Sequence, residues 1–90
     1  MRIILDLPDY DTSKGLQYKW EPGHRIDVTV DEEGVCIKGN AAGLRSLANH
    51  LLTLANEAVP RTSHIHLDSY GGLEDGSADL LITKELEELV

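Results

Sequence analysis

Residues 25–39 read RIDVTVDEEGVCIKG, and this stretch decides the fold. Apolar and polar side chains alternate in its first half, which is typical of a strand with one buried face. Two glutamates and Gly34 form a tight connection, where glycine supplies a positive φ. The second half resumes the apolar face, so the pattern predicts a β-hairpin. Its inward-facing residues would be Ile26, Val28, Val30, Val35 and Ile37.

A long amphipathic helix is predicted directly after the hairpin. Asn40 is a favourable N-cap residue, periodic sequence fills residues 41–59, and Pro60 ends the helix. Apolar residues at alternating spacings of three and four form one wide stripe, which we expect to be buried. The stripe consists of Leu44, Leu47, Leu51, Leu54 and Ala58.

Residues 63–68 read SHIHLD and predict a further strand with two different faces. Side chains alternate across a strand, so Ile65 and Leu67 would face the core. The opposite, polar face would hold His64, His66 and Asp68.

Further strands are predicted at both ends of the chain. Residues 2–7, ended by Pro8, indicate a first and fairly central strand, and residues 16–20 a short edge strand. A turn-rich loop at residues 69–77, with Leu73 in the core, precedes a last strand at residues 78–83. With 90 residues, positions 1–90 form a single domain. The expected architecture is α+β, with an antiparallel or mixed sheet of about five strands and one long α-helix packed on one face.

The composition excludes several classes of protein. Eight basic and sixteen acidic side chains give a net charge of −8, which argues against nucleic-acid or anionic-membrane binding and favours a basic partner. The single cysteine, Cys36, excludes an internal disulfide and a cysteine-based zinc site. No apolar run approaches the roughly 20 residues of a membrane span, and the N-terminal apolar stretch is too short for a signal peptide. We therefore expect a cytoplasmic protein.

The pair His64 and His66 is the clearest candidate for chemistry. Two imidazoles on one strand face, with Asp68 as a third ligand, match the spacing of some metal sites. His-x-His alone is a weak motif, and His24 and His50 would join it only if the fold brought them there. A polar sheet face used for packing or partner contact is the stronger interpretation, so we expect no cofactor and no metal.

Catalysis has little support elsewhere in the sequence. Cys36 lies in a predicted strand, and the acidic balance opposes a reactive thiolate. The glycine-rich residues 71–76 lack the ending of a phosphate-binding loop, and the pair Glu74 and Asp75 would repel phosphate. Acidic side chains cluster at residues 31–33, 74–79 and 85–88, and together they could form one negative face.

The second half of the sequence contains a specific succession of segments. GLRSLANHLLTLA at residues 43–55 is followed by VP at 59–60, SHIHLD at 63–68, GLEDGS at 72–77 and LLI at 80–82. This succession, over about half the chain (residues 35–82), resembles the immunity protein 32 family of bacterial polymorphic toxin systems. The resemblance implies a noncatalytic cytoplasmic antidote that binds and neutralises a cognate toxin, which the acidic charge predicts to be basic.

The candidate partner-binding residues come from the acidic clusters and the polar strand face. They are Asp31, Glu32, Glu33, His64, His66, Asp68, Glu74 and Asp75. Two alternatives stay open. One is a small metal-binding protein or enzyme that uses His64, His66 and Asp68. The other is a homodimeric regulatory or structural module that pairs through an exposed sheet edge.

Overall fold

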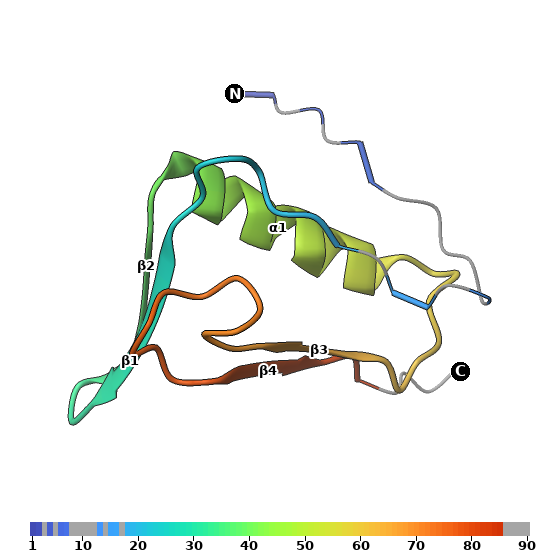
Figure 1. Cartoon of the computed structure of the whole chain (residues 1–90). Helices are drawn as coiled ribbons and strands as arrows, with labels where there is room; N and C mark the ends of the chain where they lie inside the picture. The colour runs from blue at the N-terminus through green and yellow to red at the C-terminus, as the bar shows by residue number, and fades with distance from the viewer. Residues whose placement is uncertain (3, 5, 8–12, 14, 17, 86–90) are drawn as a thin grey trace.

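The computed structural model describes residues 1–2, 4, 6–7, 13, 15–16 and 18–85. These residues contain a hairpin, a helix and a second strand pair, which confirms the α+β class. The elements are β1 (Ile26–Asp31), β2 (Gly34–Gly39), α1 (Ala41–Ala55), β3 (His64–Leu67) and β4 (Leu80–Thr83). In Figure 1, α1 lies along one side of β3 and β4, and the hairpin stands at one end of both.

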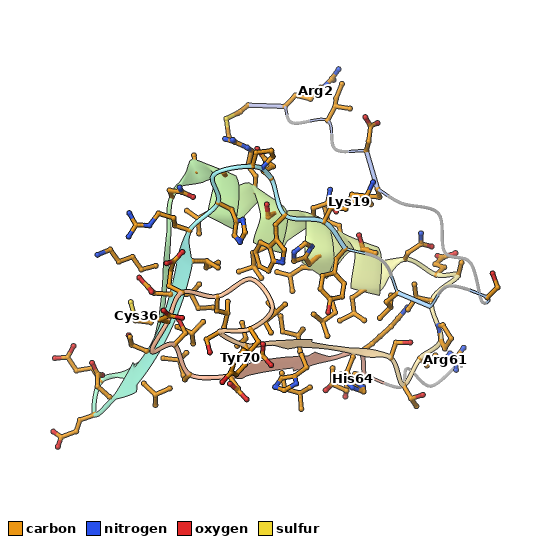
Figure 2. All side chains as sticks on the ribbon, in the orientation of Figure 1. Arg2, Lys19, Cys36, Arg61, His64 and Tyr70 are labelled. Atoms are coloured by element: carbon orange, nitrogen blue, oxygen red, sulfur yellow. The ribbon has the colours of Figure 1, made fainter. Side chains whose placement is uncertain are left out.

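The hairpin forms as predicted, but only its base is buried. Antiparallel pairing joins Val28 to Ile37 and Val30 to Val35. Ile26 and Val28 are buried, whereas the side chains of Val30, Val35 and Ile37 are exposed, so their predicted burial is wrong. The strands continue past the end of the core, and nothing in the described part of the chain covers the far half. Cys36 alternates with these residues and is also exposed (Figure 2).

The described strands form two two-stranded antiparallel sheets, β1–β2 and β3–β4, and the expected single sheet of five strands is wrong. A loop segment occupies the edge of β1 that a third strand would need. The backbone N–H groups of Glu74 and Ala78 donate to the carbonyl oxygens of Ile26 (2.9 Å) and Val28 (2.8 Å). Residues 74–78, in the loop between β3 and β4, are therefore hydrogen-bonded to the edge of β1 without forming a regular strand.

The two strands expected before the hairpin are not formed by the described residues there. In the range 2–7, residues 2, 4, 6 and 7 are exposed and outside any strand, and residues 3 and 5 lie outside the described residues. The strand at residues 2–7 was expected to be fairly central in the sheet, but the edge of β1 that does not pair with β2 is hydrogen-bonded to residues 74–78. In the range 16–20, Leu16, Tyr18 and Trp20 pack against the core without pairing, and residue 17 lies outside the described residues.

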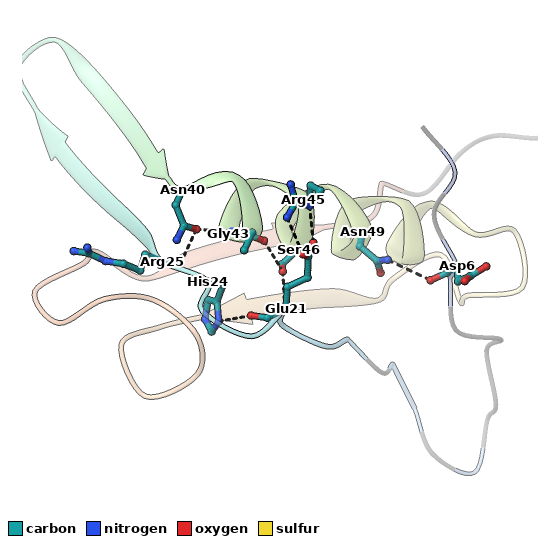
Figure 3. Close-up of polar contacts among 10 residues, drawn as sticks. Asp6, Glu21, His24, Arg25, Asn40, Gly43, Arg45, Ser46 and Asn49 are labelled. Atoms are coloured by element: carbon teal, nitrogen blue, oxygen red, sulfur yellow. Dashed lines mark hydrogen bonds and ion pairs between the residues drawn. The ribbon is translucent and has the colours of Figure 1, made fainter. Parts of the chain in front are cut away.

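Asn40 is the N-cap of α1, as predicted, and it also fixes the helix to the hairpin. Its side-chain oxygen accepts hydrogen bonds from the backbone N–H groups of Gly43 (2.8 Å) and Arg25 (3.0 Å). Its side-chain amide donates to the carbonyl oxygen of Gly23 (2.9 Å). Figure 3 shows Asn40 between the start of the helix and the start of β1. Gly43 is required at this junction because a Cβ there would collide with the Arg25 carbonyl oxygen.

The helix ends at Ala55, four residues before the predicted end. Asn56 leaves the helical conformation, and its side-chain oxygen accepts a hydrogen bond from the N–H of Ala58 (3.0 Å). This turn lets Val59 enter the core, where it is buried. The Lys84 ammonium group donates to the carbonyl oxygens of Asn56 (2.9 Å) and Val59 (3.1 Å). A cation therefore satisfies carbonyl oxygens next to the helix C-terminus, where the helix dipole favours positive charge.

The buried face of α1 is rotated away from the predicted stripe. Leu47 and Leu54 are buried as expected, but Leu44 and Leu51 are 48% and 43% exposed. The prediction for Ala58 is also wrong, because it lies beyond the helix and is exposed. Small and polar residues occupy the rest of the buried face: Gly43, Ser46, His50 and Thr53. Ser46 and Thr53 donate to the carbonyl oxygens four residues earlier, which lowers the cost of burying a hydroxyl.

The alternation predicted for residues 63–68 is confirmed over β3. Ile65 and Leu67 are buried, and they pair with Ile82 and Leu80 of β4. Leu73 is buried too, as predicted for the loop. β4 begins at Leu80, two residues later than expected. The core lies between α1, β1, β3 and the loop.

Candidate functional site

Three of the predicted contact residues form the tip of the hairpin. Asp31, Glu32 and Glu33 are exposed and consecutive, and the glutamates form the turn between β1 and β2. The side-chain oxygen of Asp31 accepts a hydrogen bond from the N–H of Glu33 (2.8 Å), and Gly34 has φ 130°. The turn is therefore built locally, and it places adjacent carboxylates at the end of a projecting element.

Glu74 and Asp75 lie at the opposite end of the hairpin. Glu74 is half-buried because its backbone N–H bonds to Ile26 at the start of β1, whereas Asp75 is exposed. Ile26 and Asp31 are five residues apart in an extended strand, which corresponds to about 17 Å. The two acidic clusters are thus at separate ends of the hairpin, at its tip and its base. They are not one continuous patch.

The polar face predicted for the SHIHLD segment is only partly formed. His64 and His66 are exposed on β3, as their alternation requires. Asp68 lies beyond β3, and its side-chain oxygen accepts a hydrogen bond from the N–H of Tyr70 (3.0 Å). His66 instead pairs with Asp79, a residue that sequence reasoning did not connect to it: His66 Nε2 is 3.1 Å from Asp79 Oδ2. The structure therefore assigns Asp68 a role in the loop turn.

Metal ligation and nucleophilic catalysis gain no geometric support. The described residues contain no group of three or more His, Cys, Asp or Glu side chains placed to hold a metal ion. Cys36 is on the first sheet and His64 on the second, at well-separated places in Figure 2. A surface depression of about 280 Å³ lies at the hairpin base, where its lining residues are Arg25, Asp27, Lys38, Gly39 and Asn40. Across the described residues, no helix is long and apolar enough to span a membrane.

The structure contains an aromatic cluster that sequence reasoning missed. His50 is fully buried, and its ring lies edge-on to Trp20 at a centroid distance of 4.5 Å. The ring centroid of Tyr18 lies 5.0 Å from that of the same imidazole, and His24 stacks on the Trp20 indole at a centroid distance of 4.5 Å. His24 Nε2 is 3.0 Å from the carbonyl oxygen of Gly72. His50 lies three residues after Leu47 and four residues before Leu54 in the sequence. This helical spacing places His50 on the same buried face as the two leucines, and it could have predicted the burial of the imidazole.

Burial makes the protonation of His50 unfavourable. Neither ring nitrogen has a hydrogen-bond partner in the described part of the chain. Desolvation, with a smaller contribution from the charge of His24, lowers the pKa of His50 from 6.5 to about 4. The imidazole is therefore neutral near pH 7 and serves as an aromatic core residue.

One polar connection fixes the segment before the hairpin against α1. Arg45 donates two hydrogen bonds of 2.9 Å to the carboxylate of Glu21, and Ser46 accepts one of 2.9 Å from the Glu21 N–H (Figure 3). The hydrogen bonds from Arg45 lower the pKa of Glu21, and the same contacts raise the pKa of Arg45. Both side chains are substantially exposed, so the pair orients the chain more than it stabilises it.

Comparison with known proteins identifies one family. The model of the family described as immunity protein 32 (Imm32) matches residues 35–85, which include most of β2 and all of α1, β3 and β4. No curated protein and no solved structure gives a significant match to the chain. The matched region covers more than half of the sequence and includes every segment on which the resemblance was based. The chain belongs to the immunity protein 32 family.

Proposed function

We propose that this chain binds a cognate toxin in the cytoplasm and blocks it stoichiometrically, without catalysing a reaction. Membership of the immunity protein 32 family is the observation that supports this function. The site geometry is compatible with it, because five of the eight candidate residues are exposed on the hairpin tip or on β3, and the other three lie in the loop that follows β3. The exposed positions suit a contact surface, and among the described residues they do not enclose a reaction centre. Inhibition would then follow from covering the toxin's functional surface.

The toxin should be a basic protein. A net charge of −8 favours rapid encounter with a positively charged surface and disfavours encounter with an acidic one. The hairpin tip presents Asp31, Glu32 and Glu33, and its base presents Asp75 beside the half-buried Glu74. Two acidic regions at the ends of one hairpin could contact basic groups on both sides of a toxin cleft.

The polar residues of β3 would supply a second part of the contact surface. His64 and His66 are exposed there, and Asp79 lies against His66. Imidazoles donate and accept hydrogen bonds, so this face suits a polar interface rim. Asp68 would act indirectly, because its side chain holds the turn at Tyr70 that follows β3.

The decisive experiment tests whether the gene directly upstream of this chain's gene encodes a toxin, and it measures neutralisation and binding kinetics with that toxin domain. Coexpression should rescue cell growth, and an inactivated toxin domain should bind the purified chain with one-to-one stoichiometry. Rescue without a direct complex would contradict the proposed mechanism.

Charge reversal tests the electrostatic part. We expect Glu32→Lys/Glu33→Lys and Glu74→Lys/Asp75→Lys each to slow association about tenfold at low salt and to weaken its salt dependence. Glu57→Lys/Glu85→Lys introduces the same charge change at two exposed positions away from the hairpin and serves as the control. Unchanged association rates for both test variants, or equal slowing in the control, would refute electrostatic steering by the two clusters.

A further inference from the structure

The far half of the hairpin, residues 29–37, projects from the body of the molecule, and we refer to it as the arm. Val28 is the last buried residue of β1, and Asp31 ends that strand three residues later. An extended strand rises about 3.3 Å per residue, so the arm reaches about 10 Å beyond the core. Figure 1 shows its end standing clear of α1, β3 and β4.

One face of the arm is apolar and continues the surface of the core. Val30 pairs with Val35, and Ile37 pairs with the buried Val28, so all four side chains share one face of the two-stranded sheet. Val30 and Val35 are each 64% exposed, and Ile37 is 40% exposed. Contiguous exposed apolar side chains next to a polar rim are typical of protein–protein contact sites.

The arm is also acidic at its end. Asp31, Glu32 and Glu33 follow immediately after the apolar face, and the Asp31 side chain holds the turn through its 2.8 Å hydrogen bond to the Glu33 N–H. A partner surface that is complementary to the arm must therefore provide apolar contacts to the strands and positive charge next to the tip. A second copy of this chain also has a net charge of −8, which disfavours close approach of two copies.

We propose that the arm inserts into a cleft of the cognate toxin whose wall is apolar and whose far end is lined by Lys or Arg. This inference depends on the proposed function and adds the surface through which it acts. Val30 and Val35 would be buried as the anchor of the interface, with the tip carboxylates paired to the basic residues. A stable interface buries roughly 800 Å² on each partner, so surfaces beside the arm would add to the contact.

The test compares variants on the two faces of the arm. Val30→Ser/Val35→Ser removes the apolar anchor. The control, Thr29→Ser/Cys36→Ser, changes the neighbouring cross-strand pair, whose side chains lie on the opposite face of the hairpin. The binding probe is the inactivated toxin domain encoded upstream, measured by surface kinetics at a concentration where sedimentation shows the unbound chain to be monomeric. Thermal unfolding and circular dichroism of each variant establish that it is folded. All four positions are exposed, so the fold should persist.

We expect the apolar variant to dissociate more than tenfold faster than the wild type and the opposite-face variant to dissociate within twofold of it. Equal dissociation of both variants from a toxin that the wild type binds would overturn the arm as the contact, while the proposed function would stand. Loss of a wild-type dimer in the apolar variant, with toxin binding unchanged, would assign the arm to self-association and also overturn the inference. Failure of the wild type to bind the toxin would overturn the proposed function and the arm inference together.

Discussion

Lowering the pH from 7 to 5 should destabilise the folded chain by about 2 kcal/mol through His50 alone. The pKa of this buried imidazole falls to about 4 on folding, from an ordinary value of 6.5. Between these two values the unfolded state binds more protons than the folded state, so stability falls as the pH falls. Each pKa unit corresponds to 1.36 kcal/mol, so the full loss of stability, which is reached below pH 4, is about 3 kcal/mol. About 2 kcal/mol of this loss is already present at pH 5.

The assay is urea unfolding at pH 7 and pH 5 for three proteins. His50→Leu removes the titrating group together with two buried nitrogens that lack partners among the described residues. His64→Leu changes an exposed histidine on β3 and serves as the control. Measurement at pH 5 leaves most carboxylates ionised, because their ordinary pKa values are about 4.

We expect the wild type and His64→Leu to lose about 2 kcal/mol between the two pH values and His50→Leu to lose markedly less. An equal loss in His50→Leu and the wild type would refute the reasoning, because acid sensitivity would then come from other groups.

Three further substitutions test the junctions that hold the helix. Asn40→Ala removes the acceptor shared by the N–H groups of Gly43 and Arg25, so thermal unfolding should show a loss of about 1–2 kcal/mol. Alanine is about 1 kcal/mol more favourable than glycine in a helix, but Gly43→Ala should destabilise the chain because the added Cβ would collide with the Arg25 carbonyl group. A rise in melting temperature would contradict this packing. Lys84→Met should cost about 1 kcal/mol in urea unfolding, because the carbonyl oxygens of Asn56 and Val59 lose a charged donor; no change would show that water replaces the ammonium group.

Local patterns in the sequence predicted the elements whose partners are close in the chain. The hairpin followed from strict alternation and the tight connection at residues 32–34, and Asn40 was identified as the N-cap from its residue type and its place before the periodic segment. The alternation in β3 also gave the correct exposed and buried faces. Each of these features depends on neighbouring residues, so no knowledge of the tertiary fold was needed.

The errors arose where tertiary contacts decided the outcome. Hydropathy placed Leu44 and Leu51 inward, but Ser46 and Thr53 could be buried instead because each donates to its own helix backbone. The segment at residues 2–7 has the composition of a strand, yet the edge of β1 is hydrogen-bonded to residues 74–78. The periodicity of a sequence indicates which residues prefer burial. Whether a strand edge is free to pair with a further strand depends on the whole fold.

The candidate site was the least predictable part for the same reason. Residue types identified the acidic clusters, but their separation to the two ends of the hairpin depends on the path of residues 69–79. Asp79 was not assigned to the histidine face because its contact with His66 crosses from β3 to the segment just before β4. Val30 and Val35 were predicted to lie in the core, and their exposure is what makes the arm a candidate contact surface.

The attachments at the base of the hairpin bear directly on how the arm would bind. Asn40 bonds to Arg25 just before β1, and Val28 bonds to both Ser77 and Ala78 on the edge that does not pair with β2. These contacts hold the strands up to the point where the arm begins, and the turn at Asp31 holds its end. An arm supported in this way has few backbone conformations to lose when it enters a cleft, so more of the apolar and electrostatic interaction energy appears as affinity. A short, locally braced hairpin can therefore serve as an anchor on a domain whose core is itself small.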